Sequence, residues 1–203
     1  MSLAVRMGGV EVSDSVDSDA DLWRALNRVD QSAFRELFLR HSDAVYNFCF
    51  RRTASWSAAE DAVQATFAAL WRRAVAGTVE ELRLDSARPV LLTMARNACS
   101  NANRTRDRQL ALVDRIREAP RDVVDDTGRW VESETTMRLI RQALSVLPAN
   151  QREVVELVAW SELSMAAAAA VLQVSVGTVK SRLFRARARL ASSPIAGLLG
   201  ELR

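Results

Sequence analysis

From Leu163 to Gly200 the chain has no acidic residue, while five basic residues lie between Lys180 and Arg189. A short apolar stretch, residues 165–172, comes just before this basic segment, and only residues 173–175 connect the two. Two short helices joined by so tight a connection have the spacing of a helix-turn-helix. A surface that carries one sign of charge suits phosphates, so the pattern predicts contact with nucleic acid.

Each of the two helices has a capping residue and the second has two distinct faces. Ser164 and Ser175 stand at the expected N-cap positions. The inward stripe of the basic helix consists of Val176, Val179, Leu183, Ala186 and Leu190. Its other face is free for the major groove and the flanking phosphates. The alternative is a solvated basic helix, but solvated faces normally mix both signs of charge.

The rest of the chain also favours helices. In 203 residues there are only four prolines and seven glycines, and 49% of the residues are hydrophobic, which is enough to bury a core. No run of 18 apolar residues is present, and the N-terminus is polar and acidic after Val5. We therefore expect neither a membrane span nor a signal peptide, and a cytoplasmic protein.

Three further helices are expected in the N-terminal half. The first begins near Asp30 or Ser32, and the second is capped by Ser57 with Glu60 in the capping-box position. The third begins about Pro89. The apolar stripes that support the first two helices are Phe34, Leu37, Phe38, His41, Val45 and Phe48, and then Ala62, Val63, Phe67, Leu70 and Trp71.

The net charge of +3 conceals two basic blocks that alternate with two acidic ones. This segregation predicts an acidic, disordered tail over 1–20, a basic helical domain over 21–108 and a flexible acidic linker over 109–134. The second basic domain covers 135–191, with a new helix starting at Pro148, and a C-terminal tail covers 192–203. The expected fold class is all-α with two small helical domains.

The sequence holds few groups for catalysis or for metal binding. Cys49 and Cys99 lie in apolar helical patterns and are expected to be buried thiols, not a disulfide. His41 is the only histidine and is expected to pack in the core or at its boundary. The chain has no glycine-rich phosphate loop, no histidine-paired nucleophile and no metal cluster, so we expect no enzyme, metal or cofactor.

Two segments carry a resemblance to a known family. The C-terminal run from Leu147-Pro148 through Gln151-Arg152-Glu153 to Arg185-Ala186 closely resembles the promoter −35-reading domain of bacterial extracytoplasmic-function sigma factors, the smallest group of the sigma-70 family. The N-terminal half resembles their other domain, through Glu60-Asp61-x-x-Gln64-x-x-Phe67 and Ala95-Arg96-Asn97-Ala98. Together these matches cover nearly the whole chain from Asp21 to Leu190.

The resemblance implies a sigma factor that binds core RNA polymerase and directs promoter-specific initiation. The partners would be the β′ clamp coiled coil, the β flap, promoter DNA and an anti-sigma factor. The residues implied in β′ binding are Glu60, Asp61, Gln64, Phe67 and Trp71. Those implied at the −10 element are Arg88, Arg96, Asn97, Asn101, Arg104 and Arg106. Those implied at the −35 element are Ser175, Thr178, Lys180, Ser181, Arg182, Phe184, Arg185 and Arg189.

The side-chain chemistry of these residues also allows other roles. Glu60 also fits a role in capping and in stabilising the helix dipole. Asn97 could contribute to a pocket for an unstacked base, or it could link its helix to the neighbouring loop by a hydrogen bond; the sequence favours neither role. Two other functions remain: a helix-turn-helix regulator that acts without polymerase, and a degenerate sigma-like interaction protein.

Several positions depart from the family pattern. Alanines fill 166–170, where relatives usually have a Glu-Ile pair at Ala167 and Ala168, and Val90 stands where a Trp is often found. Gln173 and Glu162 replace glycines. A left-handed backbone at either would cost about 1 kcal/mol for a residue with a side chain.

Overall fold

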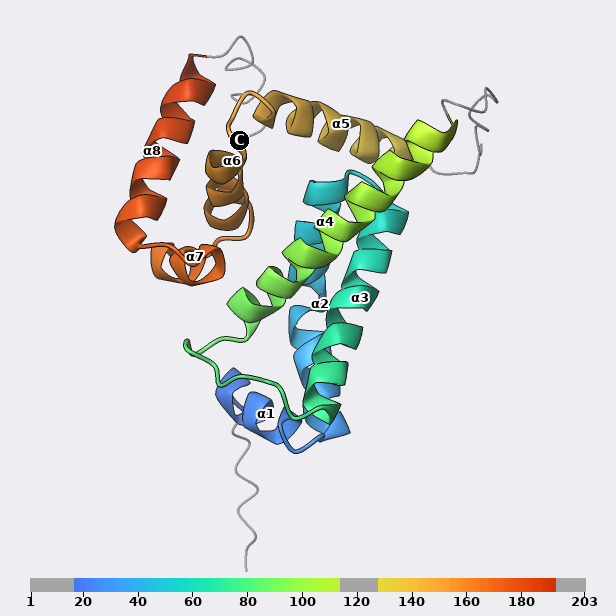
Figure 1. Cartoon of the computed structure of the whole chain (residues 1–203), viewed down its shortest axis with the longest axis vertical. Coiled ribbons are helices and arrows are strands. Elements are labelled where there is room, and N and C mark those ends of the chain that lie inside the picture. The colour runs from blue at the N-terminus through green and yellow to red at the C-terminus, as the bar shows by residue number, and fades with distance from the viewer. Residues whose placement is uncertain (1–16, 114–127, 193–203) are drawn as a thin grey trace, which may run out of the picture.

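The computed structural model describes residues 17–113 and 128–192, and every regular element in these ranges is helical (Figure 1). The elements are α1 (Asp19–Leu26), α2 (Gln31–Thr53), α3 (Trp56–Val75), α4 (Arg88–Val113), α5 (Gly128–Leu144), α6 (Ala149–Val155), the π-helical segment η1 (Glu156–Trp160), α7 (Met165–Leu172) and α8 (Val176–Ala191). The predicted all-α fold is therefore confirmed.

Helices α1–α4 pack against one another and form the first unit. The predicted stripe of α2 points inward, with Leu37, Val45 and Phe48 almost fully buried. Phe38 lies at the edge of this stripe and is 38% exposed. Helix α4 packs against both α2 and α3, so its first half is held on two sides by the core of the unit.

The helix starts follow local capping chemistry. Asp30 caps α2 as predicted, with its carboxylate accepting from the Ser32 and Ala33 amides. The cap of α3 is Ser55, so the prediction of Ser57 is wrong. Ser55 has an extended backbone and its hydroxyl accepts from the Ala58 amide, whereas Ser57 lies within the first turn.

Helix α1 was not predicted, although the sequence carries its signal. Ser18 and Asp21 form a reciprocal capping box at its start. Leu22, Trp23 and Leu26 are buried against the first unit. The folded part of the chain therefore begins before the predicted limit of the tail at residue 20. Residues 1–16 lie outside the described residues.

The second unit consists of α6, η1, α7 and α8. Pro148 is the N-cap of α6, as predicted, and η1 continues that helix with a wider turn. Ser164 caps α7 and Ser175 caps α8, each accepting from a backbone amide 3.1 Å away. Val154, Leu157 and the inward residues of α7 and α8 form the core of this unit.

Helices cover parts of the predicted linker. Helix α4 continues to Val113, and α5 begins at Gly128, so both enter the range 109–134. Residues 114–127 lie outside the described residues, as does the predicted tail from residue 193 onward. Helix α5 crosses above α2 and contacts it (Figure 1).

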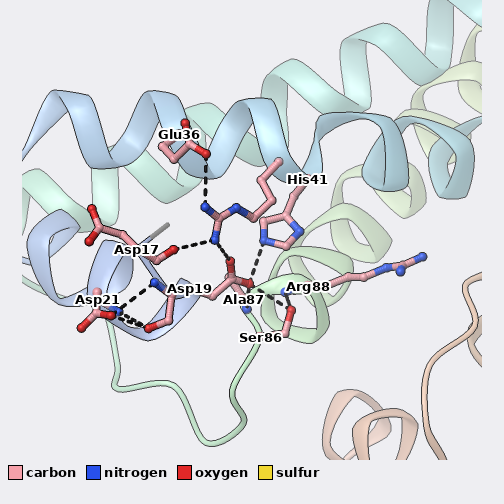
Figure 2. A network of polar contacts seen from close by, with 10 residues as sticks. Asp17, Asp19, Asp21, Glu36, His41, Ser86, Ala87 and Arg88 are labelled. Carbon is pink, nitrogen blue, oxygen red and sulfur yellow. Dashed lines mark hydrogen bonds and ion pairs between the residues drawn. The ribbon is translucent and has the colours of Figure 1, made fainter. Parts of the chain in front are cut away.

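A buried carboxylate joins α1, α2 and the start of α4 (Figure 2). The Oδ2 atom of Asp19 accepts from the Ala87 amide at 2.7 Å, from Ser86 Oγ at 3.0 Å and from His41 Nε2 at 2.8 Å. Its Oδ1 atom lies 3.0 Å from Arg40 Nη1. His41 is buried as predicted, but it belongs to a polar network that fixes the loop before α4.

Both cysteines are buried and free, as predicted. Cys49 lies on α2 and Cys99 on α4, which pack together. The hydrogen bond with Cys99, together with burial, raises the pKa of the Cys49 thiol. Both thiols thus belong to the core between these helices.

We expect Asp19→Asn to destabilise the fold and to alter its response to acid. Burial opposes ionisation of Asp19, but the Ala87 amide, His41, Ser86 and Arg40 together lower its pKa below the ordinary 3.8. The stability that it contributes is present above that ordinary value and is lost as pH falls through the lowered pKa. The substitution should cost about 1.5–3 kcal/mol at pH 7 and flatten this acid dependence.

Urea unfolding between pH 2 and pH 7 tests this expectation. Glu36→Gln is the matched control, because it removes an exposed ion pair with the same Arg40 and should change stability by under about 1 kcal/mol. Equal losses for the two variants would show that Asp19 does not anchor the network.

Candidate polymerase and nucleic-acid interfaces

The polar residues predicted on α3 share an open surface. Glu60, Asp61 and Gln64 are all exposed, while Ala62, Val63 and Phe67 of the same helix are buried. Glu60 and Gln64 are one turn apart, so their side chains lie side by side. The capping alternative for Glu60 is weakened, because the cap of this helix is Ser55. An acidic and amide surface of this kind suits a basic partner.

Phe67 and Trp71 support this surface from beneath. Phe67 is 3% exposed, and its ring centroid lies 4.7 Å from that of Phe38 and 6.4 Å from that of Phe34. Trp71 is partly buried, with its ring centroid 5.1 Å from that of Phe34. The burial expected of Phe67 in the apolar stripe of α3 is confirmed, and in this structure the ring packs in the core beneath the polar surface.

The residues predicted at the −10 element lie along α4. Arg88 stands at its first turn, where its amide donates to Ser86 Oγ at 3.2 Å. Asn97 and Asn101 are exposed. Arg96 makes an ion pair, with its Nε atom 2.8 Å from Glu153 Oε1 of α6. The side chains of Arg104 and Arg106 lie outside the described residues.

Asn97 faces a cleft of about 290 Å³. One wall is the start of α4 and the loop after α3, and the other is α7 of the second unit. The lining includes Met94, Asn97, Glu80, Arg83, Val171 and Gln173. The structure shows no hydrogen bond from the Asn97 side chain to this loop among the described residues, which favours its role as a contact residue over that of a tie.

The face of α8 predicted to read the −35 element is open. Val179, Leu183 and Ala186 are buried, while Phe184 is 75% exposed at the centre of the helix. Lys180, Ser181, Arg185 and Arg189 are exposed, and Thr178 and Arg182 are half-buried. In the described part of the chain no carboxylate makes an ion pair with a cation of α8. Arg185 instead donates to the carbonyl and the hydroxyl of Ser181.

The turn before α8 has the backbone expected of a glycine. Gln173 has φ 54° and ψ 45°, and Glu162, before α7, has φ 53°. The amide of Val174 donates to the carbonyl of Ala169 at 3.1 Å, which closes α7 and sets the direction of the chain into α8. The two helices therefore keep a helix-turn-helix geometry in spite of the missing glycines.

Carboxylates of the second unit that the sequence reasoning missed contact the first unit. Besides Glu153, Glu156 makes a half-buried ion pair with Arg52 of α2. Burial raises the pKa of Glu156, while Arg52 opposes that rise. No sequence signal identifies these pairs, because the partners are far apart in the chain: 57 residues for Arg96 and Glu153 and 104 for Arg52 and Glu156.

The chain matches known proteins along most of its length. Residues 37–109 match the family model of sigma-70 region 2, and residues 137–190 match that of sigma-70, region 4. It is 33% identical, over 86% of its own length and 83% of the relative's, to the ECF RNA polymerase sigma factor SigM of Mycobacterium tuberculosis.

Two solved structures share its architecture. One is CnrH in complex with the cytosolic domain of CnrY, with a TM-score of 0.64, 25% identity and coverage of 87% of this chain and 96% of that one. The other is the sigma factor RpoE in complex with the anti-sigma factor NepR from Bartonella quintana, with a TM-score of 0.54, 28% identity and coverage of 78% and 94%.

The two matched regions in this order, together with the 33% identity to SigM of Mycobacterium tuberculosis, show that the chain belongs to the sigma-70 family. Within that family it is an extracytoplasmic-function sigma factor, which directs RNA polymerase to promoters. The family is in general not enzymatic. Among the described residues no helix is long and apolar enough to cross a membrane, and no group of three or more acidic, histidine or cysteine residues could hold a metal ion.

We expect Gln173→Gly to stabilise the second unit. A residue with a side chain in the left-handed region is strained, and glycine removes that strain at the cost of some chain entropy, so the gain should be about 0.4–1 kcal/mol. Gln173→Ala is the control, because it removes the same side chain but keeps the strain. Thermal unfolding should place the glycine variant above wild type and the alanine variant no higher than wild type; equal shifts would contradict this account of the turn.

Proposed function

We propose that each domain has a separate target within the transcription complex. The first unit binds the β′ clamp coiled coil through Glu60, Asp61 and Gln64, on an α3 held in place by Phe67 and Trp71. The observation that carries this assignment is the exposure of all three polar side chains on one side of a helix whose other side is core.

The −10 element is captured as a melted strand along α4. Arg88, Arg96, Asn97 and Asn101 contribute, together with Arg104 and Arg106, which come later in the same helix. Melted DNA offers phosphates and unstacked bases, which need cations and a polar pocket. The cleft beside Asn97 supports such a pocket, because amide groups can recognise base edges there.

The −35 element is read as duplex by α8. Ser175 and Thr178, at the N-terminal end of α8, contact the major groove first. The other contacts come from residues farther along the helix: Lys180, Ser181, Arg182, Phe184, Arg185 and Arg189. Arginine can bind guanine bidentately, and an exposed phenylalanine suits the thymine methyl group. The absence of ion pairs on α8 among the described residues supports this role, because its cations remain available to phosphates.

Three further features complete the proposal. The second unit also contacts the β flap, and the acidic linker passes through the cationic channel of the polymerase. An anti-sigma factor is a further partner, supported by the RpoE–NepR complex among the similar structures. The protein acts by binding, without catalysis of its own, in the cytoplasm.

We expect Asp61→Arg to weaken binding to core polymerase by about tenfold or more, because it places a cation against a basic partner surface. Binding can be measured by the fluorescence of labelled sigma factor titrated with core enzyme. Asp43→Arg, the same charge reversal at an exposed site on α2, is the control and should bind like wild type. Unchanged affinity for Asp61→Arg, with duplex binding by the protein alone, would favour a regulator that acts without polymerase.

We expect Arg185→Ala to lower run-off transcription by about tenfold from promoters that depend on the −35 element, since one base contact contributes about 1–3 kcal/mol. Arg187→Ala is the control, because Arg187 is equally exposed and lies two residues farther along α8. Removing the Arg187 side chain should lower transcription by a smaller factor, and by the same factor at all promoters, as expected for a residue that contacts a phosphate. Equal, promoter-independent losses for both variants would contradict base reading by Arg185.

A further inference from the structure

The loop between α3 and α4 has little regular structure of its own. Residues 79–87, called the loop segment below, contain no helical turn. The backbone bonds that close the end of α3 stop at Thr78, whose amide donates to the Arg73 carbonyl at 2.9 Å. Leu82 and Leu84 are half-buried, so the segment lies against the first unit. Its backbone polar groups must find their partners in water or in other elements.

Helix α1 supplies partners near both ends of the loop segment. The indole Nε1 of Trp23 donates to the Glu80 carbonyl at 2.8 Å. At the other end, Asp19 Oδ2 accepts from the Ala87 amide at 2.7 Å and from Ser86 Oγ at 3.0 Å (Figure 2). In the part of the chain that the structure describes, these are the hydrogen bonds that join the segment to a helix other than α4. Helix α1 therefore holds it at two separate points.

Helix α1 is itself fixed to the rest of the first unit. Arg40 Nη1 of α2 lies 3.0 Å from Asp19 Oδ1, and His41 Nε2 lies 2.8 Å from Asp19 Oδ2. Leu22 and Leu26 of α1 are buried in the core. A helix held by both a core and a polar network is a rigid support for the loop that it anchors.

The loop segment and its anchor Trp23 border the cleft beside Asn97. The lining includes Trp23, Glu80, Arg83 and Ser86. Trp23 is 3% exposed, so it supports the wall of the cleft and is not free to stack on an entering base. Glu80 and Arg83 are exposed and bring a carboxylate and a guanidinium to this wall. The positions of these polar groups therefore depend on how the segment is held.

We propose that α1 positions the recognition site for the −10 element, with Trp23 and Asp19 as the positioning residues. They hold the loop segment in the conformation in which its polar groups, together with Asn97, discriminate among bases. This inference rests on the proposed role of the cleft in base capture. Recognition groups must be held within about 0.5 Å by the residues behind them. Loss of an anchor therefore reduces selectivity among bases even where the fold is kept.

Trypsin tests the anchor in the full chain without polymerase. Trypsin cleaves after arginine, and Arg83 is exposed within the loop segment. Trp23→Phe removes the indole donor but keeps an aromatic ring in the core. Cleavage after Arg83, followed by mass spectrometry, should accelerate about threefold or more, as expected for one lost hydrogen bond. Trp160→Phe, the same substitution at a half-buried site in the second unit, is the matched control and should leave this cleavage unchanged. Equal cleavage of wild type and Trp23→Phe would overturn the proposal.

Selectivity among −10 bases tests the functional part of the proposal. A promoter identified with the wild-type holoenzyme is varied at each −10 position in turn, and run-off transcription from the preferred base is divided by that from each other base. At the position read by the cleft, Trp23→Phe and Asp19→Asn should each lower this ratio about fivefold or more, which is the size of a single base contact. A ratio measured within one variant cancels any change in its binding to core polymerase.

Two control variants separate positioning from stability. Val45→Ala removes buried volume from the core of the first unit, and Glu36→Gln removes an exposed ion pair of Arg40. Neither removes a hydrogen bond to the loop segment, so both should keep the wild-type ratio. A ratio that falls equally in Val45→Ala and Trp23→Phe would overturn the proposal, because it would show an effect of stability alone.

An abasic nucleotide at the position that is read supplies a further comparison. With no base to recognise, wild type and Trp23→Phe should initiate equally on this promoter when transcription is normalised to the amount of holoenzyme formed. A loss by the same factor on the preferred, the substituted and the abasic promoter would contradict positioning by Trp23.

The same promoters separate this inference from the function on which it rests. If wild type prefers one base at a −10 position and Trp23→Phe shows the same preference, positioning by α1 is overturned and the −10 role of the cleft stands. If wild type initiates but prefers no base at any −10 position, the proposed role of the cleft itself fails.

Discussion

Helix α4 is packed on two sides, and the positions of the other elements follow from it. Toward α2 and α3, Leu91, Leu92, Ala95 and Cys99 are buried and hold the helix in the first unit. Toward the second unit, α4 meets α7. The start of α4 is fixed by Asp19, whose carboxylate accepts a hydrogen bond from the Ala87 amide just before the first turn. A shift of α4 would therefore alter the core, the cleft beside Asn97 and the placement of the helix-turn-helix together.

The local structure of this chain could largely be predicted from the sequence. The helical periodicity of apolar residues and the N-cap residues identified α2, α7 and α8. N-cap residues such as Asp30, Ser164 and Ser175 lie next to the helices that they begin, so they can be recognised from the sequence alone. At α3 two serines lie close together, and Ser55, not Ser57, caps the helix; at α1 the Ser18–Asp21 capping box marks a helix that was not predicted. The caps of α1 and α3 are both formed by residues within three positions of the helix start, so both could be identified from the sequence.

The contacts between the units could not be predicted in this way. Glu153 and Glu156 resemble ordinary charges on an amphipathic helix, and only the tertiary fold brings them to Arg96 and Arg52. His41 likewise fits an apolar stripe, and its bond to Asp19 depends on α1 folding back onto α2. Gln173 stands where the family usually has a glycine, and the structure gives it the left-handed backbone whose energetic cost the sequence raised as a question. The exposed residues of α3 and most of those of α8 followed from periodicity, since the buried face of each helix defines the open one. Val176 is the exception, because it was expected in the inward stripe and is 38% exposed at the first turn of α8.

Sequencing of the DNA that this protein binds with and without core polymerase tests its role as a sigma factor. We expect the reconstituted holoenzyme to enrich genomic fragments with two short motifs at a constant spacing, one for each domain, and the protein alone to enrich no such pair. Enrichment of a single duplex motif by the protein alone, unchanged when core polymerase is added, would contradict it.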